Sequence, residues 1–195
     1  MTGFMLTGLI GFGAGGEALV VGDTFDPSNK DSQITLSDGN KTAEIASGVG
    51  SVLSVAGYSA GKFYVEFLCN ATAASAQQRI GVAGSTFSVS GALGVSPSWA
   101  YRADGQKVST TPSAYGDSWT AGDVIGVALD RDAGTVTFYK NGVSQGEAFS
   151  GISGTIHFAV GTGGINADFD ITAKSSTNEL TYPPPSGFTA GWPAA

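Results

Sequence analysis

The stretch GTVTFYKNGVSQG, residues 134–146, decides the fold class. Val136 and Phe138 alternate with polar residues, which is the period-2 pattern of a strand that turns one face toward a core. Asn141–Gly142 follows, and this pair is a strong hairpin signal because a type I′ turn needs positive φ at both positions. With the apolar run before it and the strand after it, the stretch predicts a three-stranded meander over residues 122–148.

The same pattern recurs along the chain, and no segment shows a convincing helical period. In KFYVEFLC, residues 62–69, the side chains of Phe63, Val65, Phe67 and Cys69 share one face, which we expect to point inward. Many short strands separated by turn residues predict an all-β fold, a sandwich of two antiparallel sheets. The expected strands are 17–22, 32–36, 42–47, 51–56, 62–69, 79–84, 98–102, 124–130, 135–140, 143–148, 155–161 and 165–171.

Composition narrows the class of partner. The chain has 195 residues, 30 glycines, only 13% charged residues and a net charge of −7. Its nine basic residues are scattered, so neither nucleic acid nor an anionic membrane surface is an expected partner. Cys69 is the only cysteine and His157 the only histidine, so we expect no disulfide, no metal site and no cofactor.

Several blocks of sequence follow one another in a characteristic order. They are GKFYVEF (61–67), RIGVAG (79–84), WAYRADGQK (99–107), AYGDSW (114–119), WTAGDVIGVALDRDAGTVTFYKNGVSQGEAFSGISG (119–154) and YPPPSGF (182–188). Taken together, these blocks resemble the SPRY domain. The resemblance implies a bent β-sandwich of concanavalin-like, jelly-roll architecture and a non-enzymatic binding module whose loops at one end contact a partner. The Gly/Ser/Thr-rich character is similar to SPRY domains of phage virion proteins, such as tail or head fibres, which implies localisation in the virion.

The resemblance divides the chain into three parts. Residues 24–190 match the sandwich, and residues 191–195 are expected to be a short C-terminal tail. Residues 1–23 are an apolar, Gly-rich segment that we expect to attach the domain to another virion protein or to a second copy, within a homo-oligomer or a larger assembly. A disordered tail is the alternative. The assembly candidates are Phe4, Leu6, Leu9, Ile10 and Phe12.

The candidate contact residues lie in or beside the long segment 84–121, because long loops are usually functional. Trp99, Tyr101 and Tyr115 suit an interface, and Arg102 offers a fork for a carboxylate or phosphate. Packing at the edge of the sandwich is the alternative for the three aromatic residues. Trp119, close by, is expected in the core.

Other chemistry is weaker. Asp130, Asp132 and Gly134 suggest a calcium loop, but the spacing of further ligands fails and hairpin capping is expected. A glycan-cleaving enzyme would need a carboxylate pair among Glu66, Asp168 and Asp170. His157 is expected to be a plain surface imidazole.

The predicted function is a virion structural or adhesion module that binds a host surface glycan, a host protein or another virion protein. The alternatives are an intracellular adaptor that binds a peptide and a glycan-binding or glycan-cleaving protein.

Overall fold

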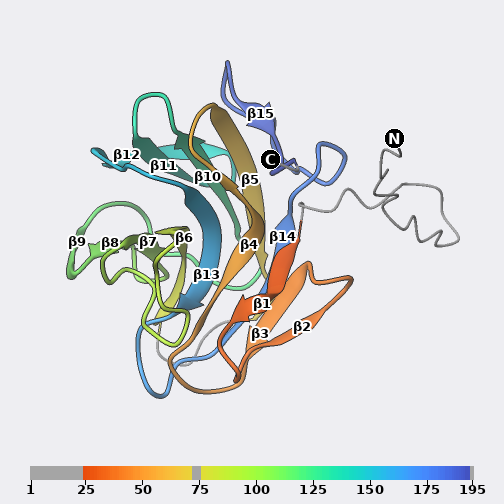
Figure 1. The fold of residues 1–195 in the computed structure, drawn as a ribbon, viewed down its shortest axis with the longest axis vertical. Coiled ribbons are helices and arrows are strands. Elements are labelled where there is room, and N and C mark those ends of the chain that lie inside the picture. Colours follow the sequence, from red (N-terminus) through yellow and green to blue (C-terminus); the bar gives the residue numbers. More distant parts are fainter. Residues whose placement is uncertain (1–23, 72–75, 194–195) are drawn as a thin grey trace, which may run out of the picture.

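The computed structural model describes residues 24–71 and 76–193, and the predicted strand 17–22 and the assembly candidates of residues 1–23 lie outside that part. Two sheets pack face to face, and the described residues contain no helix (Figure 1). This confirms the predicted all-β sandwich. The first sheet, sheet A, has the order β1 (Phe25–Lys30), β4 (Ser51–Tyr58), β13 (Ile156–Thr162), β6 (Gln78–Gly84), β7 (Ser98–Arg102), β8 (Gln106–Ser109), β9 (Thr111–Ala114).

The second sheet, sheet B, contains the predicted meander at one edge. Its order is β12 (Val143–Phe149), β11 (Thr135–Lys140), β10 (Val124–Asp130), β5 (Lys62–Cys69), β14 (Phe169–Lys174), β3 (Thr42–Ile45), β2 (Thr35–Ser37), and the short β15 (Thr189–Ala190) also pairs with β5. The strand pairs are antiparallel apart from β15 with β5.

The hairpin chemistry is confirmed at each predicted position. Asn141 and Gly142 have φ of 50° and 79° between β11 and β12, as a type I′ turn requires. Val136 and Phe138 are buried in the core between the sheets. On β5, Val65, Phe67 and Cys69 point inward as expected, while Phe63 is half-buried and stacks on Tyr58.

Two expectations about strands were wrong. The strand placed at 165–171 begins only at Phe169, because Gly163–Gly164 and a turn closed by Ala167 N–H to the Gly164 carbonyl occupy the preceding residues. The predicted strand 98–102 is confirmed as β7, but the rest of the segment 84–121 is not loop throughout, since β8 and β9 also run through it. Strands β1, β8, β9 and β15 were not predicted, because their residues show no clear period-2 alternation.

Residues 85–97, the cover segment, lie against the outer face of sheet A. Phe87 and Leu93 pack there on Leu53, with small residues of β6, β7 and β13 completing a second, smaller hydrophobic cluster. Several backbone hydrogen bonds hold the segment in place, among them those from Ser51 N–H to the Val89 carbonyl and from Leu93 N–H to the Thr162 carbonyl. Part of the segment expected to be a functional loop is therefore a packed layer.

Residues 175–193, the C-terminal strap, cross the outer face of sheet B. The Glu66 carboxylate lies beneath it, fully buried, and accepts hydrogen bonds from Thr181 N–H (2.6 Å), Tyr182 N–H (2.9 Å) and the Tyr64 hydroxyl (3.2 Å). These three donors satisfy a charge that would otherwise be costly to bury.

The end of the strap enters the core between the two sheets. Trp192 is 0% exposed, with ring centroids 5.6 Å from Phe25, 5.8 Å from Phe67 and 5.5 Å from Phe158. Trp192 thus lies beyond the boundary predicted at residue 190, yet its ring is part of the main core. An indole of this size stabilises the fold mainly through the apolar area it removes from water.

Candidate functional site

Three connections meet at one end of the sandwich, the lower end in Figure 1. They are the β3–β4 loop (46–50), the described part of the β5–β6 loop (70–71 and 76–77) and the β13–β14 loop (163–168), and together we name them the loop cluster. Gly48 N–H donates to the Ala167 carbonyl (2.9 Å), and Gly163 N–H donates to the Gln77 carbonyl (3.1 Å). Backbone bonds therefore hold the β13–β14 loop on both sides.

The side chain of Thr162 strengthens this arrangement. It is fully buried at the end of β13, where its hydroxyl donates to the Gly48 carbonyl (2.8 Å) and accepts from Gly50 N–H (3.2 Å). One hydroxyl thus satisfies two backbone groups of the neighbouring loop. The loop cluster is consequently a fixed surface rather than three independent loops.

Ile165 stands at the tip of the fixed β13–β14 loop and is 79% exposed, a high value for a large apolar side chain. Single exposed apolar residues are common on proteins, but this one is held on a loop that is bonded from both sides. The rigid loop means that little conformational freedom is lost when a partner covers the side chain. Ile165 is therefore the best-placed contact residue of the loop cluster.

A buried arginine supports the loop from below. Arg79 on β6 is only 6% exposed, and its Nη1 donates to the Leu93 carbonyl (2.5 Å). A Cβ atom at Gly163 would lie 1.8 Å from its Nη2, so a larger residue there would displace the guanidinium group. Burial, and then the positive charge of Arg102 on β7, lower the pKa of Arg79 to about 10. Arg79 therefore joins the cover segment to the loop cluster.

The predicted contact residue Tyr101 is instead a core residue. It is 0% exposed, its ring lies 5.5 Å from that of Phe138, and its hydroxyl donates to the Asp117 carbonyl. On β7 it points between the sheets, since alternate residues of the strand face the cover segment. A buried ring cannot touch a partner, so this assignment is corrected. Trp119 is buried in the core, as expected.

Trp99 lies on β7, and Tyr115 directly follows β9 and contacts β12. Both are half-buried and pack against the main core. The Tyr115 hydroxyl donates to the Gly146 carbonyl (2.5 Å), and Lys107 Nζ donates to the Ala148 carbonyl (2.7 Å). Packing at the sandwich edge, the alternative for these residues, thus accounts for their positions, and a contact role for them stays a prediction.

Arg102 does not present an open fork. Its guanidinium forms two hydrogen bonds with the carboxylate of Asp104, one of them 2.8 Å from Nε to Oδ1. This pairing with Arg102, which outweighs the opposing effect of burial, lowers the pKa of Asp104. A carboxylate or phosphate of a ligand would have to compete with Asp104 for the same donors.

Among the candidate catalytic and metal-binding groups, Glu66, Asp130 and Asp170 have structural roles. Glu66 is buried beneath the strap, and Asp170 accepts a hydrogen bond from Asn70 Nδ2 (2.8 Å). Asp130 accepts from the backbone N–H of Asp132 and Ala133, the capping expected of a hairpin loop. Within residues 24–71 and 76–193, no group of three or more His, Cys, Asp or Glu side chains could hold a metal ion.

Cys69 and His157 also act within the fold. Cys69 is buried, and that burial raises the pKa of its thiol to about 11. His157 is half-buried rather than a plain surface residue, with Nδ1 2.9 Å from the Ser54 carbonyl.

The described part of the chain has no helix that is long and apolar enough to cross a membrane.

Sequence reasoning missed the loop cluster, and with it Ile165 and Arg79. The available signal was GGINAD, residues 163–168, in which an apolar residue stands among residues typical of turns. Because Ala167, Phe169 and Ile171 continue the alternation, the whole stretch resembled a strand. Only the backbone bonds to the neighbouring loops show where the strand begins.

Comparisons with known proteins agree with this architecture. An E3 ubiquitin-protein ligase, RKP of Arabidopsis thaliana, is 49% identical over 55 residues, which are 27% of this chain and 4% of that protein. This chain therefore matches only a small part of that curated relative. The SPRY domain of human HERC1 has a TM-score of 0.70 at 22% identity, covering 78% of this chain and 98% of that chain. Another human SPRY domain has a TM-score of 0.57 at 19% identity, covering 73% and 94%.

The family assignment rests on the sequence model of the SPRY domain, which matches residues 62–169, more than half of the chain. The matched region runs from the start of β5 to the start of β14 and includes the meander. The structural matches show the same two-sheet fold. This chain therefore belongs to the SPRY domain family, whose members are protein-interaction modules.

Proposed function

We propose that this SPRY domain is a non-enzymatic module that binds a partner through the loop cluster and serves as a structural or adhesive part of a phage virion. The observation that carries the binding proposal is Ile165, 79% exposed on a loop that neighbouring loops hold by backbone hydrogen bonds. An apolar side chain that is already fixed loses little entropy on binding, so it suits an anchor at the centre of an interface.

The non-enzymatic part of the proposal is supported by the burial of Glu66, the best catalytic candidate. Glu66 would have to reach a substrate to act as an acid or base. It is instead buried, with both carboxylate oxygens accepting hydrogen bonds from the strap and from Tyr64. Its role in holding the strap accounts for the residue without catalysis.

The virion setting is supported by the sequence itself. The chain is rich in glycine and poor in charge, and its sandwich resembles the SPRY domains of phage virion proteins. In this proposal residues 1–23 attach the domain to the particle, and the loop cluster contacts a host receptor or another virion protein. An intracellular adaptor is the second candidate, favoured by the 55-residue match to the plant ligase RKP. It would use the same loop cluster to capture a peptide.

The binding surface is tested with Ile165→Asp and the matched control Val143→Asp. Val143 is another exposed apolar residue, 65% exposed at the start of β12 and outside the loop cluster. We expect Ile165→Asp to weaken binding of the full chain to host cells or purified particles by about thirtyfold, equivalent to ~2 kcal/mol for an interface anchor. The control should bind as the unaltered protein does, with the affinities measured by titration of fluorescently labelled protein.

The virion setting has its own test, immunogold electron microscopy of particles purified from the source strain. Gold on the particles supports it. Particles without gold, together with capture of a short peptide that Ile165→Asp abolishes, would favour the adaptor. Equal binding by the two Asp variants, with both folded by circular dichroism, would remove the loop cluster as the contact surface.

A further inference from the structure

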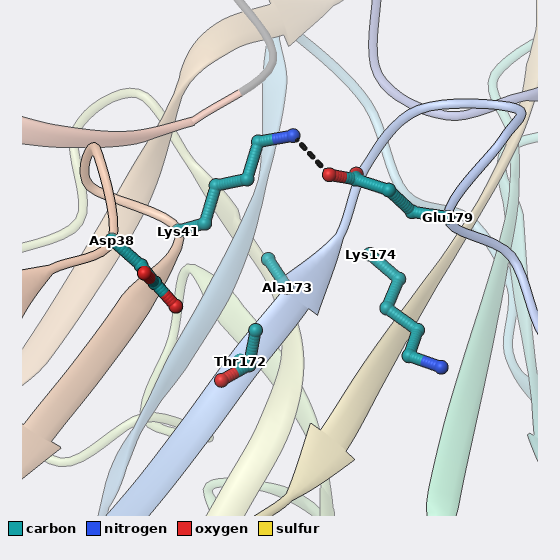
Figure 2. Close-up of a pocket in the computed structure, with 6 residues that line it drawn as sticks. All are labelled: Asp38, Lys41, Thr172, Ala173, Lys174 and Glu179. Atoms are coloured by element: carbon teal, nitrogen blue, oxygen red, sulfur yellow. Dashed lines mark hydrogen bonds and ion pairs between the residues drawn. The ribbon is translucent and has the colours of Figure 1, made fainter. Parts of the chain in front are cut away.

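A groove of about 520 Å³ lies on the outer face of sheet B (Figure 2). Its floor is the outer side of β14, one wall is the β2–β3 turn, and the other wall is the beginning of the C-terminal strap. In Figure 2, Lys41 and Glu179 meet across one side, while Thr172 lies between Asp38 and Lys174. The lining residues are Asp38, Lys41, Thr172, Ala173, Lys174 and Glu179.

The polar side chains of the groove are held in place by hydrogen bonds. Lys41 Nζ lies 2.5 Å from Glu179 Oε1, and Glu179 Oε2 accepts from the backbone N–H of Ser175 and Ser176. Lys174 Nζ donates to the Thr181 hydroxyl (2.5 Å). Side chains fixed in this way need little reordering when a ligand arrives.

A chain of hydrogen bonds also crosses the floor. The Thr172 hydroxyl lies 2.8 Å from that of Thr42 and accepts from Asn70 Nδ2 (2.9 Å). The Thr42 hydroxyl in turn donates to Asp38 Oδ2 (3.4 Å). Residues from the β5–β6 loop, β3 and β14 therefore form one polar network that ends at the carboxylate in the groove, and it presents both donors and acceptors.

The charges of the lining cancel, and this selects the class of ligand. Two lysines, Lys41 and Lys174, face two acids, Asp38 and Glu179. Burial favours the neutral form of Glu179, but the hydrogen bonds from Lys41 and Ser176 outweigh it and lower the pKa of this carboxyl. A phosphate would meet both carboxylates, and an organic cation would meet both ammonium groups. The balance therefore favours a neutral ligand that both donates and accepts hydrogen bonds.

We propose that this groove binds a neutral, hydroxyl-rich ligand, a single saccharide unit of a glycan. Vicinal hydroxyls can donate to Asp38 and accept from Lys174, while Thr172 can do either. The methylene stems of the two lysines offer apolar surface to the C–H groups of a sugar ring. The lining contains no aromatic ring, so the expected affinity for one unit is on the order of millimolar.

The test is a titration of the full, isotope-labelled chain followed by NMR. The probes are the methyl glycosides of glucose, mannose and galactose, with inorganic phosphate and free arginine as charged controls. At least one glycoside should shift the amide signals of Lys41, Thr172 and Lys174. The proposal is overturned if no glycoside shifts them at tens of millimolar, or if only phosphate or arginine does.

Asp38→Asn and its control Glu44→Gln sharpen the test. Asp38 has a φ of 55°, a conformation that asparagine tolerates, so the turn should survive the substitution. Glu44 is an exposed carboxylate on the same sheet face, outside the groove. We expect Asp38→Asn to weaken glycoside binding at least fivefold and Glu44→Gln to leave it unchanged. Equal weakening by both would contradict the site. Ile165→Asp should leave glycoside binding unchanged. A negative result for the groove would therefore not bear on partner binding by the loop cluster.

Discussion

The outer faces of the two sheets are covered by two different kinds of contact. On sheet A the cover segment packs Phe87 and Leu93 onto Leu53 and forms a small second core. On sheet B the strap is held at Glu66 by two backbone amides, and its end is held by Trp192 in the main core. The cover segment is attached mainly by the burial of several apolar side chains. The strap is attached by hydrogen bonds to a buried carboxylate and by the burial of one large ring, that of Trp192.

This difference matters for how each cover responds to change. Apolar burial is shared over many atoms, so its loss scales with the area and the cavity that a substitution leaves. The attachment at Glu66 depends on a few hydrogen bonds, and removing one partner leaves buried donors unsatisfied. Beside that attachment the strap turn and the β2–β3 turn leave the polar groove that we propose as a saccharide site.

The largest effect is expected at the end of the strap. Trp192→Ala should lower the free energy of unfolding by ~4 kcal/mol, because it removes a fully buried ring from among Phe25, Phe67 and Phe158. Urea denaturation followed by circular dichroism measures the loss. Phe188→Ala is the control, since Phe188 belongs to the same strap but is only half-buried. Equal losses in the two variants would show that Trp192 is not the anchor of the strap.

A somewhat smaller loss of stability is expected when an apolar side chain of the cover segment is shortened. Leu93→Ala should cost ~3 kcal/mol of unfolding free energy, the usual range for a buried leucine. The control Val95→Ala alters an exposed position of the same segment and should change stability by less than ~0.5 kcal/mol. If both substitutions proved neutral in urea denaturation, the second hydrophobic cluster would contribute no stability.

The smallest loss of stability is expected when Glu66, which holds the strap by hydrogen bonds, is substituted. In Glu66→Gln the amide group replaces one acceptor oxygen and faces a donor, so stability should fall by ~2 kcal/mol. The loosened strap should also be cut faster by trypsin after Lys174, at the end of β14. Glu44→Gln, an exposed carboxylate of the same sheet face, is the control for both measurements. An unchanged rate of cleavage after Lys174 would mean that Glu66 does not hold the strap.

Much of the scaffold could be predicted from local pattern. The Asn141–Gly142 turn and the inward positions of Val136 and Phe138 depend on residues close in sequence, and all three predictions are confirmed. Tyr101 is a residue whose role could not be predicted from local pattern. An aromatic residue with a polar tip suits an interface or a core equally well, and only packing against Phe138 decides between them.

The sequence by itself determined most of the longer strands, the Asn141–Gly142 turn and the SPRY family, because these depend on alternation and turn chemistry within a few residues. The tertiary structure alone decided what covers each sheet and which side chains remain exposed. Trp192 is distant in sequence from Phe25 and Phe67, and the loops that hold Ile165 are distant from each other. Burial is a property of the assembled sheets, so no local pattern could show that Glu66 is enclosed and Ile165 is exposed.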